Sequence, residues 1–137
     1  MGNTRHGGEE RRLLQERAVL KITLPWPPKE LSPNARSHWA KKAKFVKAYR
    51  QECFVIARNS RLVAAWDGPI HLWVTFYPPD RRRRDDDNVY ASFKAARDAL
   101  ADAMGIDDNR LRYRPFLHDE VRKGGEIVVS ITSGPEE

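Results

Sequence analysis

Hydrophobic and polar positions recur with two different periods along this chain, and the period distinguishes its helices from its strands. From Ser37 to about Leu62, the apolar residues Phe45, Tyr49, Cys53 and Ile56 recur at intervals of three or four. At about 100° per residue these side chains form one apolar stripe, so the segment is predicted to be an amphipathic helix. Cys53 lies on that stripe and is predicted to be a core residue.

A second helical pattern extends from Asn88 to Met104. Its apolar positions are spaced alternately by four and three residues, and they are Val89, Phe93, Ala96, Leu100 and Ala103. This spacing is a strong amphipathic signature. Asp87 or Asn88 is predicted to cap the start of this helix, and Gly105 stands where a helix is expected to stop.

Four segments are predicted to be strands because they are rich in β-branched and aromatic residues: Val19–Leu24, Ile70–Tyr77, Leu111–Leu117 and Glu126–Thr132. The second is apolar almost throughout, which predicts cover on both of its faces. The third contains Pro115, which has no amide hydrogen to donate, and is therefore expected at a sheet edge.

The order of elements is strand, helix, strand, helix, strand, strand. It predicts an α+β fold with a small mixed β-sheet and two helices. The 137 residues fit one domain. We assign residues 18–137 to that domain and residues 1–17, which are charged and contain glycine, to a disordered basic arm.

The net charge of the chain indicates what kind of molecule it binds. The formal net charge is +6, which favours a polyanion such as nucleic acid. On the first predicted helix Lys44, Lys47 and Arg50 lie opposite the apolar stripe, and Glu52 is the only acid between Arg36 and Arg61. This basic face predicts contacts with a nucleic-acid backbone. A solvated surface is the alternative.

The sequence also excludes or disfavours several other kinds of site and protein. A single cysteine excludes an intramolecular disulfide and a cysteine-based zinc cluster, and it fits a reducing cytoplasm. No apolar run approaches the ~20 residues of a membrane span, so no membrane partner is expected. Nucleotide-binding P-loop and zinc-protease motifs are absent.

The most unusual segment is Pro79–Asn88, in which Arg81, Arg82, Arg83 and Arg84 lead directly into three aspartates. Guanidinium groups can bind phosphate through two hydrogen bonds, whereas carboxylates repel phosphate unless a cation lies between them. A hard divalent ion with oxygen ligands would resolve that conflict. The combination suggests cleavage of a phosphodiester. The alternative is a solvated loop whose charges neutralise one another.

Asp85 and Asp87 would point the same way from an extended backbone. Asp108 lies one helix further on, so it needs either the return of the chain or a partner subunit to join them. Lys94 follows Asp87 by seven residues and would share its helix face, where it could stabilise a leaving oxygen. Alternatively, Asp87 is only a helix cap and Lys94 a surface residue.

Several motifs together resemble the RusA family of Holliday-junction resolvases. They are Ile22–Pro28, the block from Pro79 to Asn88, the run from Lys94 to Leu100, Asp107-Asp108 and Lys123–Gly125. The resemblance implies a magnesium-dependent homodimeric endonuclease that acts on four-way DNA junctions, typical of phages and prophages and hence expected in a bacterial cytoplasm. Mn²⁺ is expected to substitute for Mg²⁺.

By the same resemblance, Asp85, Asp87 and Asp108 are the metal-binding carboxylates and Lys94 is the catalytic lysine. One departure is that the gap before Lys94 is about one helical turn longer than in the best-known bacterial member. Two hypotheses follow: a nuclease that resolves junctions, or acts on other branched DNA or RNA, and a non-catalytic DNA- or RNA-binding module. Intact aspartates beside the arginines favour the nuclease.

Overall fold

The computed structural model describes residues 20–36 and 38–134, so the predicted arm at residues 1–17 lies outside the described residues. The strands are β1 (Lys21–Pro25), β2 (Ile70–Tyr77), β3 (Leu111–Leu117) and β4 (Glu126–Thr132). The helices are α2 (Trp39–Asn59), α3 (Asp86–Ala91) and α4 (Lys94–Met104), with short 3₁₀ turns η1 (Lys29–Leu31) and η2 (Asp108–Arg110). No helix within these ranges is long and apolar enough to cross a membrane.

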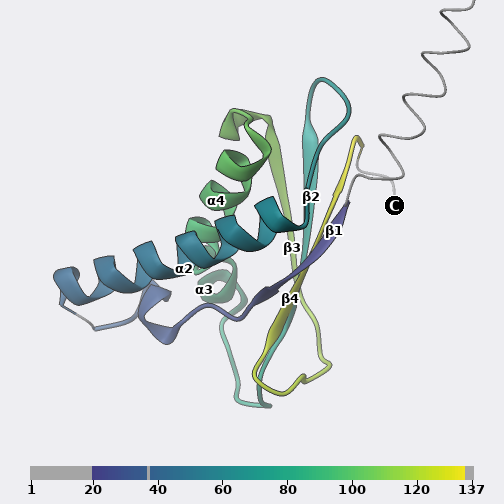
Figure 1. The fold of residues 1–137 in the computed structure, drawn as a ribbon. Coiled ribbons are helices and arrows are strands. Elements are labelled where there is room, and N and C mark those ends of the chain that lie inside the picture. The colour runs from purple at the N-terminus through teal and green to yellow at the C-terminus, as the bar shows by residue number, and fades with distance from the viewer. Residues whose placement is uncertain (1–19, 37, 135–137) are drawn as a thin grey trace, which may run out of the picture.

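The strands form one mixed sheet in the order β1-β4-β2-β3 (Figure 1). β4 pairs antiparallel with β1 and with β2, whereas β2 and β3 run parallel. β3 lies at the edge, as Pro115 predicted. The α+β fold with a small mixed sheet is therefore confirmed.

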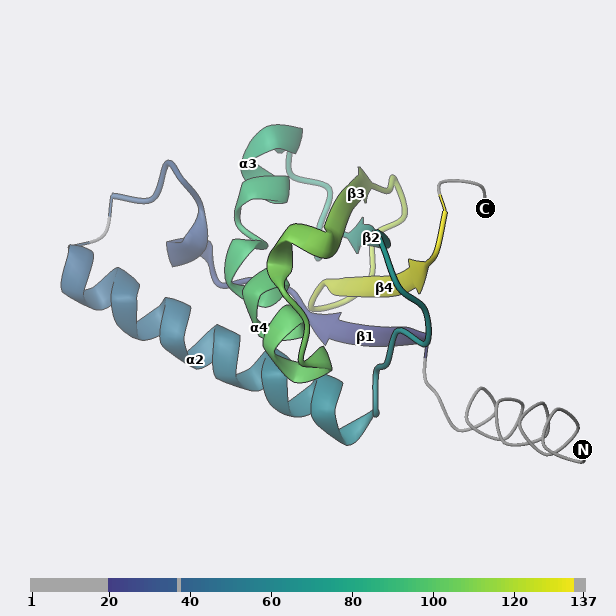
Figure 2. The same cartoon turned by 90° about the horizontal axis from the view of Figure 1, so that it is seen from above.

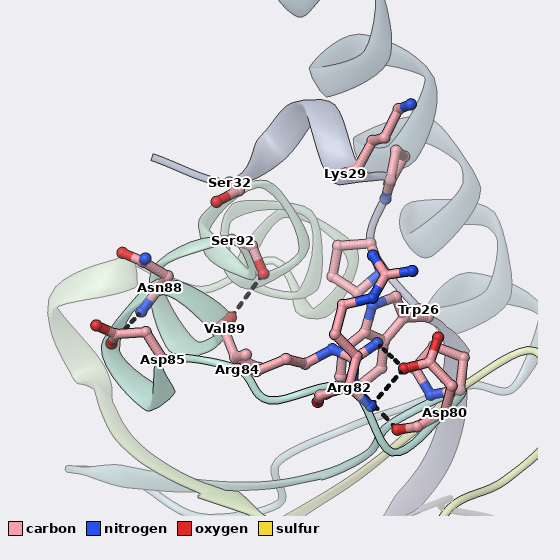
Figure 3. Close-up of a pocket in the computed structure, with 13 residues that line it drawn as sticks. Trp26, Lys29, Ser32, Asp80, Arg82, Arg84, Asp85, Asn88, Val89 and Ser92 are labelled. Carbon is pink, nitrogen blue, oxygen red and sulfur yellow. Dashed lines mark hydrogen bonds and ion pairs between the residues drawn. The ribbon is translucent and has the colours of Figure 1, made fainter. Parts of the chain in front are cut away.

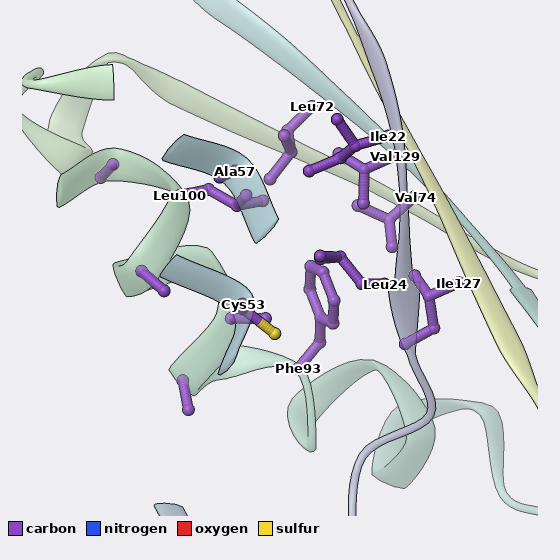
Figure 4. Close-up of a cluster of buried hydrophobic side chains, with 14 of the residues drawn as sticks. Ile22, Leu24, Cys53, Ala57, Leu72, Val74, Phe93, Leu100, Ile127 and Val129 are labelled. Carbon is purple, nitrogen blue, oxygen red and sulfur yellow. The ribbon is translucent and has the colours of Figure 1, made fainter. Parts of the chain in front are cut away.

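The helices of residues 20–36 and 38–134 all lie on one face of the sheet (Figures 1 and 2). On that face Leu72, Val74 and Phe76 of β2 are fully buried and form the core with residues of α2 and α4 (Figure 4). The predicted cover on both faces of β2 is wrong, because the alternate residues Trp73 and Tyr77 are only half-buried. The sequence of β2 is almost continuously apolar because aromatic side chains occupy its open face.

α2 is anchored to the sheet by its second half. Tyr49, Cys53 and Ala57 are its buried residues, and the Tyr49 hydroxyl donates a hydrogen bond of 2.7 Å to the carbonyl oxygen of Pro25. Burial raises the pKa of the Cys53 thiol to about 12. Cys53 is therefore a neutral core residue, as its place on the stripe predicted.

The helix predicted from Asn88 to Met104 is wrong as one element, because the structure divides it into α3 and α4. The Ser92 hydroxyl donates a hydrogen bond of 2.6 Å to the carbonyl of Val89, and Phe93 leaves the helical conformation with φ −88° and ψ 1°. Phe93 is completely buried, with its ring 5.5 Å from that of Phe76. The helix is therefore interrupted at a residue whose side chain is buried in the core. Gly105 ends α4 with φ 67°, as expected.

The turn before β4 packs closely against the segment after β1. Gly125 has φ +77°, and a Cβ built on it would lie 2.7 Å from the Trp26 Cβ. Gly124 has nearly the same φ, +78°, but a Cβ at that position would meet no atom within 4 Å. The two glycines thus share a backbone conformation and differ in steric surroundings.

This difference predicts unequal effects of alanine at the two positions. Gly124→Ala should destabilise the protein by about 1–2 kcal/mol because of its left-handed backbone alone. Gly125→Ala should cost about 1–3 kcal/mol more, since it also overpacks against Trp26. Urea unfolding of both variants measures the difference, and equal midpoints would contradict the contact.

Candidate nuclease site

Asp85 precedes α3 and is its N-cap, a role predicted for Asp87 or Asn88. One oxygen of Asp85, Oδ1, accepts hydrogen bonds from the backbone amides of Asp87 at 2.9 Å and Asn88 at 3.3 Å. Asp85 and Asp87 are both exposed. Because capping uses one oxygen, the second carboxylate oxygen of Asp85 remains available to a ligand. Asp87 lies in the first helical turn, so the argument from an extended backbone does not apply to it.

The four arginines before Asp85 are not equivalent. Arg84 is only 16% exposed and forms an ion pair of 2.9 Å with Asp80 (Figure 3). Its guanidinium also lies over the Trp26 ring, 5.6 Å from the centroid. Arg81, Arg82 and Arg83 are exposed. Arg84 therefore shapes the loop, whereas the other three present their charge to solvent.

An open cavity of ≈ 410 Å³ lies between this loop and the segment after β1. Trp26, Lys29, Arg82 and Asp85 are among the residues that line it (Figure 3). With Arg84, which also lines it, the cavity brings three cations, one aromatic ring and one candidate metal ligand to the same place. Such a cavity suits an anionic substrate near a carboxylate only if the carboxylate's charge is offset.

Asp108 and Lys94 lie elsewhere. Both line a second cavity, together with Arg50, Asp98 and Asp102. Lys94 is 69% exposed, and its Nζ is 3.2 Å from a carboxylate oxygen of Asp98 one helical turn later. Lys94 begins α4, so it does not continue the helix of Asp87. The prediction that the two share one helix face assumed one continuous helix, and the break at Phe93 removes that basis.

Topology explains why Asp85 and Asp108 are separated. β2 and β3 are parallel, with Ile70 opposite Leu111 and Phe76 opposite Leu117. The chain leaves β2 toward Asp85 at one end of this pair and re-enters β3 after Asp108 at the other. Arg110 holds that return, donating a hydrogen bond of 2.7 Å to the carbonyl of Trp66.

A metal site within one chain therefore lacks support. Among residues 20–36 and 38–134, no three His, Cys, Asp or Glu side chains lie close enough together to hold a metal ion. From the sequence, Asp108 could join Asp85 either by the return of the same chain or by a partner subunit. In the structure, the return of the same chain does not bring Asp108 to Asp85. Assignment of Asp85, Asp87 and Asp108 as ligands stays a prediction that needs a second subunit.

The basic face of α2 is present, with Lys44 and Lys47 exposed. Arg50 instead forms an ion pair with Asp102 of α4, and this hydrogen bond raises the pKa of its guanidinium above the usual value. DNA binding by these residues remains a prediction.

Sequence reasoning missed the acidic partners Asp80, Asp98 and Asp102. The first two follow a readable signal, since Asp80–Arg84 and Lys94–Asp98 are both four residues apart. Arg50 and Asp102 are 52 residues apart, and only the packing of α2 on α4 joins them.

Asp80 provides a titration test of this loop. Hydrogen bonds from the Arg82 amide and then the Arg84 side chain lower the pKa of its carboxyl below the ordinary value. The stabilisation that ionised Asp80 gives to the folded protein is fully present above the ordinary aspartate pKa of about 3.9. It is lost as pH falls through the lower pKa that Asp80 has in the folded protein. In Arg84→Ala the Asp80 pKa should rise, and in Arg83→Ala it should stay unchanged. Carboxyl NMR titration measures both, and an unchanged pKa in Arg84→Ala would contradict the ion pair.

Known proteins of similar sequence include nucleases, although no family model matches the chain. An uncharacterized protein of Xylella fastidiosa is 50% identical over 114 residues, covering 81% of this chain and 74% of that protein. The crossover junction endodeoxyribonuclease RusA of Escherichia coli K12 is 34% identical over 116 residues, covering 81% of this chain and 92% of RusA. The protein of the same name from Enterobacteria phage 82 matches with the same identity and coverage.

Proposed function

Since the chain belongs to the RusA family of crossover junction endodeoxyribonucleases, we propose that it is an endonuclease that resolves four-way DNA junctions by paired symmetric nicks. The relationship across 92% of the length of RusA carries this proposal. The loop of residues 79–85 before α3, here called the Arg/Asp loop, supports it from the structure, because it exposes three arginines shortly before Asp85. Cations that bind phosphate therefore lie close to a carboxylate.

Binding is assigned to two basic surfaces. Arg81, Arg82 and Arg83 form one, and Lys44 and Lys47 of α2 contribute to the other. Exposed arginine and lysine side chains bind DNA mainly through phosphates, so these contacts recognise the branched shape of a junction more than its sequence. Arg50 can join the second surface by exchanging its ion pair with Asp102 for a DNA phosphate, because exposed ion pairs are weak.

The metal site is assigned to a homodimer. Three carboxylates are the donors that Mg²⁺ prefers, but one chain does not gather Asp85, Asp87 and Asp108. We therefore place Asp85 and Asp87 of one subunit beside Asp108 of the other. Such a dimer has two identical sites, which matches the two-fold symmetry of a four-way junction.

Each group has a chemical role in this proposal. Bound Mg²⁺, or Mn²⁺ in its place, would supply an activated water and offset the charge of the phosphate. Arg82 lines the same cavity as Asp85 and can hold the phosphate there. Lys94 must leave Asp98 to stabilise the leaving oxygen, and an exposed i,i+4 pair opposes that movement only weakly. Because Lys94 lies with Asp108, both would come from the same subunit.

The second candidate is a DNA-binding module without catalysis. The capping hydrogen bonds of Asp85 favour it, since they explain that aspartate without any metal. Capping does not explain the exposed carboxylate of Asp87, which is not the cap.

Replacing Asp87 separates the two candidates. Asp87→Asn should reduce cleavage of a synthetic four-way junction in Mg²⁺ by at least about a hundredfold, since metal charge stabilisation is worth several kcal/mol. Junction binding in chelator should persist, and α3 should remain capped by Asp85. Gel assays of nicking and binding measure both effects.

The matched control is Asp86→Asn, which removes a neighbouring exposed charge that has no assigned role. It should retain cleavage within a few-fold. Near-normal cleavage by Asp87→Asn, or cleavage by the wild type in chelator, would contradict the nuclease proposal.

Mixed dimers test the shared site. Asp87→Asn and Asp108→Asn homodimers should both be inactive. In a mixed dimer, both changes fall in one shared site and the other site is intact, so single nicks should return. If each subunit held its own site, each of the two sites in a mixed dimer would carry one of the two substitutions, and neither would be intact. Refolded mixtures that remain inactive would therefore contradict sharing, without contradicting nuclease activity of the wild type.

A further inference from the structure

The N-terminal half of α2 extends beyond the part of the helix that the core supports. Between Trp39 and Ala48 no residue is fully buried, whereas Tyr49, Cys53 and Ala57 are buried in the second half. In Figures 1 and 2 this half of α2 extends away from the sheet. Ten residues of helix correspond to about 15 Å. We call residues 39–48 the α2 arm.

The α2 arm carries a strongly basic sequence and one exposed indole. Its lysines are Lys41, Lys42, Lys44 and Lys47, and it contains no acidic residue. Trp39, at its tip, is 76% exposed, more than any other large apolar side chain in the described ranges. The neighbouring His38 ring lies 5.6 Å away and covers it only in part. Trp39 therefore exposes a large apolar surface on a helix segment that is rich in lysine.

Helical geometry places Trp39 on the same side as two predicted DNA contacts. Lys47 follows it by eight residues and Arg50 by eleven, so the three side chains fall within about 80° around the axis. Arg50 also lines the cavity that contains Lys94 and Asp108. The face therefore runs continuously from the exposed indole to two residues of the proposed catalytic site.

This arrangement suits DNA with unpaired bases. Cationic side chains that follow a backbone, combined with an aromatic ring on which a base can stack, are the common features of single-strand recognition. The strand crossover of a four-way junction is the place where bases can lose a stacking neighbour. We propose that Trp39 stacks on an unstacked base at the crossover while the lysines of the α2 arm hold the adjacent phosphates. This inference rests on the proposed junction substrate.

Charge complementarity favours DNA over the other possible occupants. An anionic membrane surface would also attract lysines, but membrane-surface helices present a broad apolar face. Here Phe45 and Val46, the other large apolar residues of the arm, are half-buried against the protein and present no such face. A second subunit covering Trp39 would also have to cover Lys47, which is exposed and lies about 80° from Trp39 around the helix axis.

Affinity measurements with three Trp39 variants test the inference in chelator, where no cleavage occurs. Trp39→Ala should weaken binding to a four-way junction by about tenfold to a hundredfold, the effect of losing one stacked base. Trp39→Phe should recover most of the affinity and Trp39→Leu little of it. Binding to linear duplex should change less than about threefold, because its bases, apart from those at the ends, remain stacked.

The control is Val55→Ala, which removes an exposed apolar side chain from the opposite face of the same helix. Val55 is 41% exposed and should be replaceable without effect on either DNA. A junction with 2-aminopurine at the crossover should also lose protein-dependent quenching in Trp39→Ala.

Several outcomes would overturn the stacking role of Trp39: unchanged junction affinity in Trp39→Ala, equal rescue by leucine and phenylalanine, or an equal loss on linear duplex. Dissociation of the dimer by Trp39→Ala, seen by light scattering, would assign Trp39 to the subunit interface. Trp39-dependent binding to anionic vesicles with unchanged DNA binding would assign it to a membrane. If the wild type shows no preference for junctions over duplex, the proposed function itself fails.

Discussion

The parallel pairing of β2 with β3 is the constraint on which the arrangement of this protein depends. Parallel neighbours cannot be joined by a tight turn, so the chain must cross from the end of β2 to the beginning of β3. The Arg/Asp loop, α3, α4 and η2 form that crossover. The loop starts at one end of the strand pair and Asp108 stands at the other. A single topological requirement therefore separates the carboxylates that the chemistry would need to combine.

Phe93 holds the crossover against the sheet. It is completely buried beside Phe76 and Tyr113, and it stands where the chain leaves helical geometry between α3 and α4. The longer spacing before Lys94 therefore produces a new helix start instead of one more turn of the same helix. As a result, Lys94 lies with Asp98 and Asp108 and apart from Asp85.

Several cations that are expected to meet DNA have acidic partners in the isolated chain. Arg84 pairs with Asp80, Lys94 with Asp98 and Arg50 with Asp102. Pairs between exposed side chains contribute little to stability, typically about 0–1 kcal/mol. For Lys94 and Arg50, exchange of the carboxylate for a phosphate therefore requires little free energy. Arg84 differs, because its contacts with Asp80 and Trp26 leave it mostly buried and make it part of the loop's framework.

The sequence by itself determined the class of fold, the bounds of β2, β3 and β4, the edge position of β3 and the core role of Cys53, whereas β1 includes Pro25, which was expected to end it. Periodicity and the missing amide hydrogen of proline are local properties that can be read from the sequence. The burial of Cys53 follows from its place on a periodic apolar stripe. The sequence also showed the Arg/Asp block and its resemblance to the RusA family, because that block is contiguous.

Only the tertiary structure decided which charged groups meet. Pairing of Arg50 with Asp102 depends on how α2 packs on α4, and no spacing in the chain encodes that contact. The break at Phe93 is not visible in the sequence, because the apolar spacing from Val89 to Ala103 continues through it. The separation of Asp85 from Asp108 depends on strand direction, which periodicity does not contain, since parallel and antiparallel strands alternate alike.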